Sequence, residues 1–326
     1  MSLATYKESF LKVLRYFPKH WEQEKHWGYY ITMLAFLGIS MYINYFWVEG
    51  TTIERLMVSK FRAKEVLVLW YMLFYGIPYV FGLVAYAAFH QRWDLLRNPQ
   101  MWTRALFVIF VLSFDAAFYY HYYAYRMVEG MPERYWARKV AGNFNSVLAM
   151  WLPLFLYWYF RDRKQMGHLY GLTFKNYDYR PYVILLLLMV PLVVGASFTE
   201  DFIRYYPTLK HRIVKDIAAV PLWFAYVIYE IAYASDFIWT ELVFRGFMVI
   251  GMAQSLGAAS VGAMAGVYCY RHFAKPMGEA GSSIFGGYIL GVIALGSRNI
   301  QGGVYVHMGI ALLMELSAFL QFALRP

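Results

Sequence analysis

The stretch that decides the fold reads Asp236-Phe-Ile-Trp-Thr-Glu241-Leu-Val-Phe-Arg245-Gly-Phe-Met-Val-Ile250. Glu241 and Arg245 are four residues apart, a spacing that places both side chains on one face of an α-helix. Ionisable groups inside a hydrophobic helix are costly, so they usually face a protein interior or a wet cavity and mark function. The stretch therefore predicts a membrane-embedded helix with a functional pair, and Asp236 is expected to cap the N-terminus of that helix.

The composition places this helix in a membrane protein. Hydrophobic residues make up 60% of the chain and charged residues 15%, whereas soluble domains carry about half apolar and about a quarter charged residues. Aromatic residues reach 21%, which fits Trp and Tyr gathered at the two membrane interfaces. The net charge of +10 is assigned to basic loops that meet lipid headgroups, and no nucleic acid partner is expected.

Apolar stretches long enough to cross a bilayer, which takes about 20 residues, recur along the chain and predict an all-α polytopic bundle of about nine or ten transmembrane helices. A sheet is not expected, because an open sheet cannot satisfy its backbone in lipid. Lys and Arg lie in loops on both sides of the spans, so the positive-inside rule gives no orientation. The stretches lie near residues 28–48, 66–89, 102–124, 143–160, 181–198, 216–234, 236–253, 256–272, 283–296 and 303–323.

The chain divides into three parts by composition. Residues 1–27 mix charged and aromatic residues without the long apolar core of a signal peptide, and predict either an amphipathic helix on the membrane surface or a solvated tail. Residues 28–180 are bulky and aromatic and predict N-terminal transmembrane helices. Residues 181–326 are rich in Gly and Ala, and small residues spaced four apart let helices approach closely. These small-residue pairs are Gly262/Gly266 and Gly287/Gly291.

Three polar motifs fall within residues 181–326. They are Glu241/Arg245, then Tyr268-x-x-x-His272, then His307 with Ala311 and Glu315 on the same face of the last span. A carboxylate and two histidines that converge in a membrane-embedded cavity can activate water as a general base and stabilise the oxyanion formed on an attacked carbonyl. The same groups can instead hold a zinc ion with an open position for water. Because the His-Glu-x-x-His spacing of zinc proteases is absent, the expected site has no metal and no cofactor.

Each polar residue also has a structural interpretation. The Glu241–Arg245 pair can be an inert ion pair that locks helices together, and His272 can be an interfacial histidine near the end of a span. Glu279 is interpreted as a loop residue near the membrane surface. Asp115 and His121 are isolated in the third span, and are interpreted as polar contacts between helices.

In their order along the chain, Glu241-x-x-x-Arg245, Tyr268-x-x-x-His272 and His307 resemble the motifs of the CPBP family. This family comprises type II CAAX prenyl endopeptidases and bacteriocin-processing (Abi) intramembrane proteases, and carries Glu-Glu-x-x-x-Arg, Phe-x-x-x-His and His-x-x-x-Asn or Asp on separate core helices. The resemblance covers about residues 180–323. It implies a glutamate-type, metal-independent intramembrane protease, and a location in the bacterial inner (cytoplasmic) membrane.

Two positions depart from the family pattern. Thr240 stands where the family has its first glutamate, the water-activating base, and Ala311 stands where the family has an Asn or Asp oxyanion donor. A threonine cannot act as a general base near neutral pH. Three outcomes therefore stay open: Glu241 takes the role of the base, another carboxylate such as Glu315 or Glu279 replaces it, or the site is inactive as a protease.

The resemblance implies two sets of site residues. The catalytic set is Glu241, Arg245, His272 and His307, and the binding set is Thr240, Tyr268, Ala311 and Glu315. In the first hypothesis the protein is an endopeptidase: His272 and Glu241 activate water, His307 stabilises the oxyanion, and Arg245 orients Glu241. Its partners are then the lipid bilayer and a membrane-associated protein or peptide substrate.

The alternative hypothesis is a catalytically inactive CPBP-like subunit. Such a subunit binds or scaffolds a partner membrane protein or a lipid-linked ligand, and the two departures from the family pattern favour it. A transporter is a third hypothesis and ranks lower, because transporters of that kind are built from two matching halves and the halves of this chain do not match.

Overall fold

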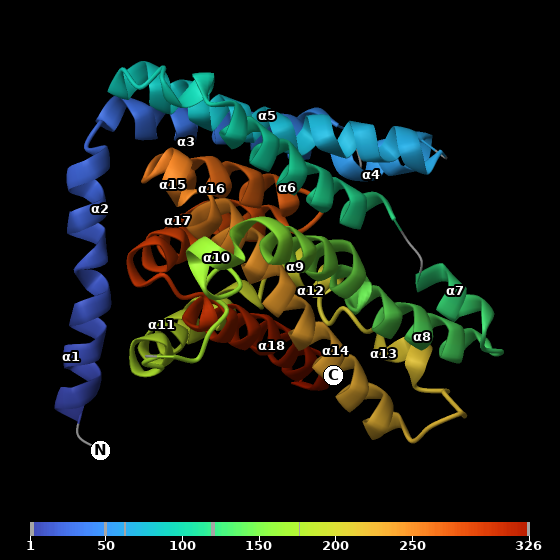
Figure 1. Cartoon of the computed structure of the whole chain (residues 1–326). Helices are drawn as coiled ribbons and strands as arrows, with labels where there is room; N and C mark the ends of the chain where they lie inside the picture. The colour runs from blue at the N-terminus through green and yellow to red at the C-terminus, as the bar shows by residue number, and fades with distance from the viewer. Residues whose placement is uncertain (1–2, 49–50, 62, 119–120, 176, 325–326) are drawn as a thin grey trace.

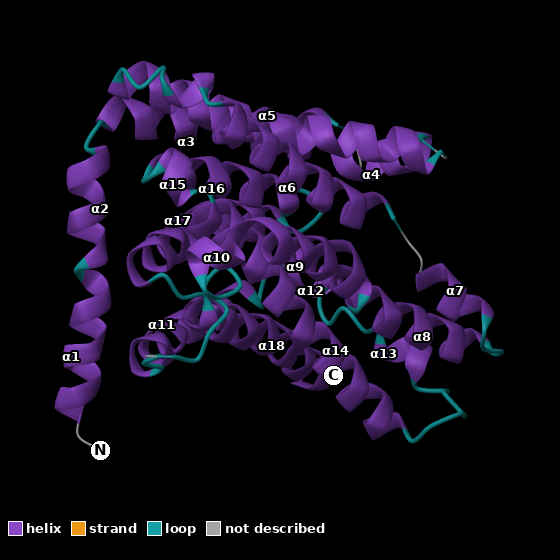
Figure 2. Cartoon of the chain, viewed as in Figure 1, coloured by secondary structure: helices purple, strands orange, loops and turns teal. Residues whose placement is uncertain are grey.

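The computed structural model describes residues 3–48, 51–61, 63–118, 121–175 and 177–324. Within these ranges the chain folds into helices and contains no β-strand (Figures 1 and 2). Six helical segments in the described ranges are long and apolar enough to cross a membrane: Trp27–Trp47, Lys64–His90, Pro99–Ala117, Met131–Met166, Met277–Ser297 and Gln301–Leu324. The predicted all-α polytopic class is confirmed, and the chain is a multi-pass membrane protein.

Long helices alternate with short helical segments along the chain. The N-terminal elements are α1 (Leu3–Leu14), α2 (Tyr16–Glu24), α3 (Trp27–Tyr42), η1 (Ile43–Trp47), α4 (Ile53–Lys60), α5 (Lys64–His90), η2 (Leu95–Arg97), α6 (Pro99–Ala117), α7 (His121–Arg126) and α8 (Met131–Asn143). They are followed by η3 (Val147–Trp151), α9 (Leu152–Tyr157), η4 (Trp158–Asp162) and α10 (Arg163–Met166). The C-terminal elements are α11 (Arg180–Ala196), α12 (Glu200–Tyr205), α13 (His211–Val214), α14 (Leu222–Glu241), η5 (Leu242–Gly251), α15 (Ala253–Leu256), α16 (Ala259–Arg271), α17 (Met277–Ser297) and α18 (Gln301–Leu324).

One predicted boundary is wrong. The expected break between the stretches 216–234 and 236–253 is absent, because residues 222–251 form a single rod in which α14 continues without a break into the π-helix η5. Asp236 therefore lies inside α14 and does not cap a helix. Its carboxylate accepts a hydrogen bond from the hydroxyl of Ser146, a residue 90 positions earlier in the chain. A polar partner on a neighbouring segment explains how an acidic residue is tolerated within an apolar helix.

The small residues of the C-terminal part lie where helices approach closely. On α17, a Cβ added at Gly291 would lie 2.8 Å from Met264 of α16, and one added at Gly287 would lie 3.0 Å from Tyr268. On α16, a Cβ added at Gly262 would collide with the hydroxyl oxygen of Tyr29. These glycines allow α16 to pack closely against its neighbours in the buried centre of the fold. The polar residues at the C-terminal end of α16 therefore also lie inside the fold.

The two ends of the bundle differ in what covers them. We call the end where α17 finishes and α18 begins the α1 end, and the opposite end, where α16 finishes and α17 begins, the α13 end. Helices α1 and α2 run end to end along the left edge of the view, across the direction of α3, α5 and α18 (Figure 1). At the α13 end, α12 and the residues that follow it lie against the C-terminal half of α18, whereas α13 packs against α8 and α14.

Candidate functional site

Glu241 is the centre of a buried polar cluster. It lies at the junction of α14 and η5, and its Oε1 accepts hydrogen bonds from Arg245 Nη1 at 2.8 Å and from His307 Nδ1 at 2.9 Å. Its other oxygen, Oε2, has no hydrogen-bond partner among the described residues. A Cβ added at Gly303 would lie 2.5 Å from that oxygen, so the glycine leaves room for the carboxylate. The structure therefore joins two of the three predicted motifs at one carboxylate, within a π-helical turn of the kind often found at functional sites.

Arg245 is fixed by a ring as well as by a carboxylate. Its side chain is 1% exposed, and its guanidinium carbon lies 4.1 Å from the centroid of the Tyr268 ring. A cation over an aromatic face is attracted by the ring quadrupole, most strongly when water is excluded. Arg245 therefore orients both Glu241 and Tyr268, which come from different helices.

The hydrogen bonds of His307 define which nitrogen carries its proton. A carboxylate only accepts, so Nδ1, which faces Glu241, carries the hydrogen of the neutral ring. The other nitrogen, Nε2, then accepts from the hydroxyl of Tyr268 at a distance of 3.2 Å. The ring of Phe237 packs against the imidazole with centroids 4.4 Å apart. His307 is thus held at both nitrogens, and Tyr268 is the donor nearest to Nε2.

His272 is held differently. It follows the last residue of α16, where backbone carbonyls lack partners within the helix, and its Nδ1 lies 2.8 Å from the carbonyl oxygen of Tyr268. A carbonyl only accepts, so Nδ1 carries the hydrogen and Nε2 keeps a basic lone pair. This Nε2 lies 3.9 Å from Oε1 of Glu279. The distance is too long for a direct hydrogen bond and suits a contact bridged by water.

Glu279 joins the site through tertiary contacts that the sequence does not reveal. Pro276 precedes α17, so Glu279 falls in the first helical turn, where a negative charge is favoured. Its Oε1 lies 2.6 Å from Nζ of Lys275, and its Oε2 accepts from the hydroxyl of Tyr206 at 2.8 Å. Burial lowers the pKa of Lys275, but the Glu279 carboxylate and Tyr205 together raise it, and the pKa lies above its ordinary value. The interpretation of Glu279 as a surface loop residue is wrong, because it lies in a helix beside His272. The only signal in the sequence was the spacing Lys275-x-x-x-Glu279.

The remaining predicted residues lie around this cluster or away from it. Thr240 is half-buried and precedes Glu241, so it points about 100° away around the helix. Ala311 is buried one turn beyond His307 and offers only a methyl group. Glu315 lies two turns beyond His307 and binds Thr208, accepting from its backbone nitrogen and from its hydroxyl. Glu315 therefore anchors the residues between α12 and α13.

The pairing of groups differs from the first hypothesis in one respect. The sequence led us to pair His272 with Glu241 as the water-activating groups. In the structure Glu241 binds His307, and the carboxylate that faces His272 belongs to Glu279. The two histidines thus each have a carboxylate, and Tyr268 lies between them, with its hydroxyl toward one and its carbonyl toward the other.

A second buried network lies beside this site. Asp115 of α6 accepts from Arg271 Nη2 at 2.8 Å and from Asn145 Nδ2 at 2.9 Å. This agrees with the interpretation of Asp115 as a polar contact between helices, although its partner Arg271 was not foreseen. The side chain of His121, which received the same interpretation, lies outside the described part of the structure.

Comparison with known proteins gives no assignment: no family model matches the chain, and neither a curated protein nor a solved structure matches it. Among the described side chains, no three His, Cys, Asp or Glu residues converge as a set of metal ligands. The Glu241 cluster and the His272–Glu279 pair are therefore the features of the molecule that support a function.

Proposed function

We propose that this protein is an intramembrane endopeptidase that hydrolyses a peptide bond with a water activated by His272. The observation that carries the proposal is the fixed tautomer of His272, whose basic Nε2 faces the Glu279 carboxylate at 3.9 Å. A water between two acceptors donates a hydrogen to each and keeps its lone pairs free to attack. Glu279 also stabilises the imidazolium that forms when His272 takes the proton.

The chemical step involves only groups of this chain, water and the substrate. The water oxygen bonds to the carbonyl carbon as one of its protons moves to Nε2 of His272, and the carbonyl π electrons move onto oxygen. Collapse of this tetrahedral oxyanion breaks the C–N bond, and the proton on Nε2 passes to the leaving amine. No metal or cofactor is required by this scheme.

Tyr268 and His307 are the proposed groups for the oxyanion. The Tyr268 hydroxyl lies 3.2 Å from Nε2 of His307 and can turn from that nitrogen to a substrate oxygen. The side chain of His307 is 13% exposed, whereas Glu241 and Arg245 are almost completely enclosed. We therefore assign Glu241 and Arg245 as positioning residues that hold His307 and the Tyr268 ring, rather than as groups that touch the substrate.

The resemblance stated above suggests the substrate and the location. A CPBP-like protease would act on a membrane-associated protein or peptide and would lie in the bacterial inner membrane. The Glu279 side of the site lies toward the α13 end, where the hydroxyl of Tyr206 reaches Glu279. We therefore propose that the substrate enters at this end, past the residues that Glu315 anchors through Thr208.

The test is capture of substrate from native membranes. Full-length wild type is compared with His272→Ala, and with His211→Ala as a control at an exposed histidine of the same end of the bundle. Bound proteins are identified by peptide-level mass spectrometry. We expect the His272→Ala variant to retain an intact membrane protein that wild type and His211→Ala release as fragments. Removing a positioned base typically lowers the rate by about 10²–10⁴-fold.

A second function is favoured by one specific observation. Oε1 of Glu241 is already bound by both Arg245 and His307, and Thr240 offers no carboxylate beside it. This arrangement also suits an inactive subunit that holds a partner membrane protein or a lipid-linked ligand. The same unprocessed partner on all three forms of the protein would refute the protease and support the inactive subunit.

A further inference from the structure

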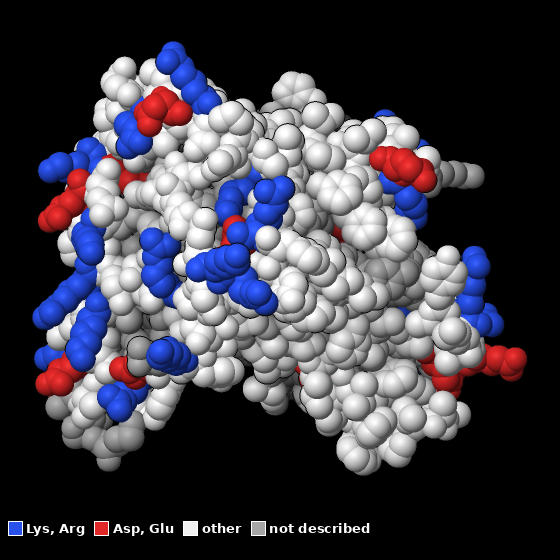
Figure 3. Space-filling model, viewed as in Figure 1, with Lys and Arg blue, Asp and Glu red and all other residues white. Residues whose placement is uncertain are grey.

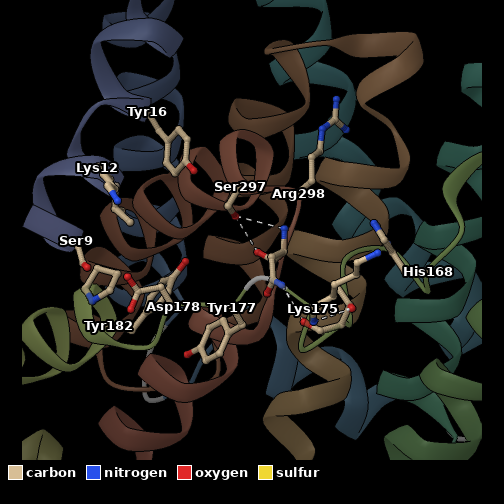
Figure 4. Close-up of a pocket in the computed structure, with 14 residues that line it drawn as sticks. Ser9, Lys12, Tyr16, His168, Lys175, Tyr177, Asp178, Tyr182, Ser297 and Arg298 are labelled. Atoms are coloured by element: carbon tan, nitrogen blue, oxygen red, sulfur yellow. Dashed lines mark hydrogen bonds between the residues drawn. The ribbon is translucent and has the colours of Figure 1, made fainter. Parts of the chain in front are cut away.

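A cavity at the α1 end is separate from the Glu241 cluster. It has a volume of about 460 Å³, and none of its lining residues belongs to the two carboxylate–histidine pairs. Its walls come from α1, the segment between α10 and α11, and the turn between α17 and α18. Figure 4 shows Lys12 on one side of the cavity and His168 and Lys175 on the other. Three segments that are far apart in the sequence thus enclose one space.

The charge of the cavity is predominantly positive. Lys12, Lys175 and Arg298 line it. The acidic residue in the wall, Asp178, lies 3.7 Å from Nε of Arg180 and accepts from the backbone nitrogen of the same residue. Its charge is therefore offset by a neighbour. Arg298 Nη1 donates to the carbonyl oxygen of Ile250 at 3.5 Å, so Lys12 and Lys175 are the cations of the wall that we assign to an anion.

The cavity also contains an unsatisfied hydroxyl. The hydroxyl of Tyr177 is buried and has no hydrogen-bond partner among the described residues. A buried polar atom without a partner costs free energy, and such an atom often marks a place where a ligand or water binds. In the close-up, Tyr177 is drawn below Lys12 and Lys175 on the wall of the same cavity (Figure 4). An anion in the cavity would give this hydroxyl an acceptor.

The surroundings place the cavity at the level of lipid headgroups. It lies where α17 ends and α18 begins, and both are spans by length and composition. Lys7, Arg15 and Lys19 are exposed on α1 and α2 and on the residue between them. Blue side chains line the left edge of Figure 3, where these two helices lie. Basic helices that run along the end of a bundle attract anionic lipid surfaces.

We propose that the α1-end cavity binds a phosphoryl anion, held by Lys12, Lys175 and the hydroxyl of Tyr177. Lysine ammonium groups bind phosphate oxygens as point charges, and the tyrosine adds one neutral donor. Two sources carry this chemistry at a membrane surface: the headgroup of an anionic phospholipid and a soluble phosphate ester. The proposal does not depend on the proposed peptidase, and its test measures binding alone.

The test uses full-length protein in detergent and native mass spectrometry with added phosphatidic acid or phosphatidylcholine. We expect tighter binding of phosphatidic acid to wild type. We expect Lys12→Gln/Lys175→Gln to weaken that binding about 20-fold, since a basic residue near an anionic surface contributes about a fivefold factor in affinity. Tyr177→Phe removes one neutral donor and should weaken binding about threefold.

A matched control removes the same charge from the same surface. Lys7→Gln/Lys19→Gln changes two exposed lysines that do not line the cavity, and is expected to change the affinity by no more than about twofold, because neither ammonium group contacts an anion bound there. Equal losses in the two pairs, or equal affinity for both lipids, would overturn the proposal. Competition with glycerol 3-phosphate distinguishes the two sources of the phosphoryl group. Displacement of phosphatidic acid by a similar concentration of glycerol 3-phosphate indicates a soluble ester as the ligand. No displacement indicates the lipid headgroup.

Discussion

Two pairs of an arginine and a buried carboxylate lie near each other in this fold, and they are built in opposite ways. Glu241 and Arg245 are one turn apart on one continuous helix, while Asp115 and Arg271 connect α6 to α16. The Asp115 carboxylate uses one oxygen for Arg271 and the other for Asn145. The Glu241 carboxylate concentrates its partners on one oxygen and leaves the other without any among the described residues.

The difference indicates what each pair does. A pair whose oxygens are divided between separate segments ties those segments together, and contributes to the fold. A pair that leaves Oε2 of Glu241 and Nε of Arg245 unsatisfied carries a cost of about 1–3 kcal/mol for such groups, and native structures keep few of them. We therefore assign the Asp115–Arg271 pair to structure and the Glu241–Arg245 pair to the site.

The largest effect is expected from removing one charge of the enclosed pair. Glu241→Gln leaves Arg245 charged and buried, so it should destabilise the protein by about 3–5 kcal/mol and abolish cleavage. Asp115→Asn should cost less, because the side chain of Arg271 is 30% exposed and reaches water. Thermal unfolding of the purified protein in detergent compares the two variants. A larger loss for Asp115→Asn would reverse the comparison.

Removing both charges of each pair separates stability from activity. Replacing a buried ion pair as a unit is often close to neutral, so Glu241→Gln/Arg245→Gln and Asp115→Asn/Arg271→Gln should both recover most of the stability lost in the single variants. Only Glu241→Gln/Arg245→Gln should remain impaired in activity. Its rate of cleavage should lie below that of wild type by a factor of about 10² or more, because His307 and the Tyr268 ring are no longer held in position. Cleavage of the captured substrate is the readout. Equal activity in the two folded variants would remove Glu241 from the site.

A smaller change tests the position of the carboxylate alone. Gly303→Ala places a methyl group 2.5 Å from Oε2 of Glu241, and displacing a positioning group by about 1 Å can lower the rate about 10²-fold. Gly195→Ala is the control, because a Cβ there meets no atom within 4 Å. We expect Gly195→Ala to be fully active and slightly more stable, since alanine favours a helix. Unchanged cleavage by Gly303→Ala would show that the carboxylate can move without consequence.

The smallest effect is expected at Glu315. Glu315→Gln should weaken the hydrogen bonds from Thr208, a net change of about 1 kcal/mol, which corresponds to about fivefold faster opening of that segment. Hydrogen exchange of residues 206–210 measures the opening, and the amides of α16 serve as the internal reference. A loss of cleavage as large as that of His272→Ala would instead place Glu315 among the groups that act on the substrate.

Much of the fold follows from local sequence signals. Apolar length predicts all six candidate spans of the described residues, although four of the ten expected stretches (181–198, 216–234, 236–253 and 256–272) are not among them. The spacing of four predicts both the Glu241–Arg245 contact and the close approach at Gly287 and Gly291. Asp236 shows the limit of such signals, because a polar residue can cap a helix or lie within one. The choice depends on Ser146, which is distant in the sequence and close only after folding.

The candidate site, too, is only partly predictable from local sequence signals. The residues of the three motifs are readable from their order, and the structure brings Glu241, Arg245, Tyr268, His272 and His307 together. The role of Glu279 depends on Tyr206 and on the packing of α17 against the end of α16, so no local pattern predicts it. Glu315 shares a helix face with His307, but its hydrogen bonds are with Thr208.

The continuous rod of α14 and η5 has a consequence for the lipid around it. Its 30 residues from Leu222 to Gly251 span about 45 Å at an α-helical rise, well beyond the roughly 30 Å of a hydrocarbon core. A helix longer than the hydrocarbon core is accommodated by tilting or by extending beyond the core. Trp223 and Ile231 are exposed on the first half of the rod, whereas all of η5 is buried in protein. The tilt of the rod therefore affects the depth at which Glu241 lies.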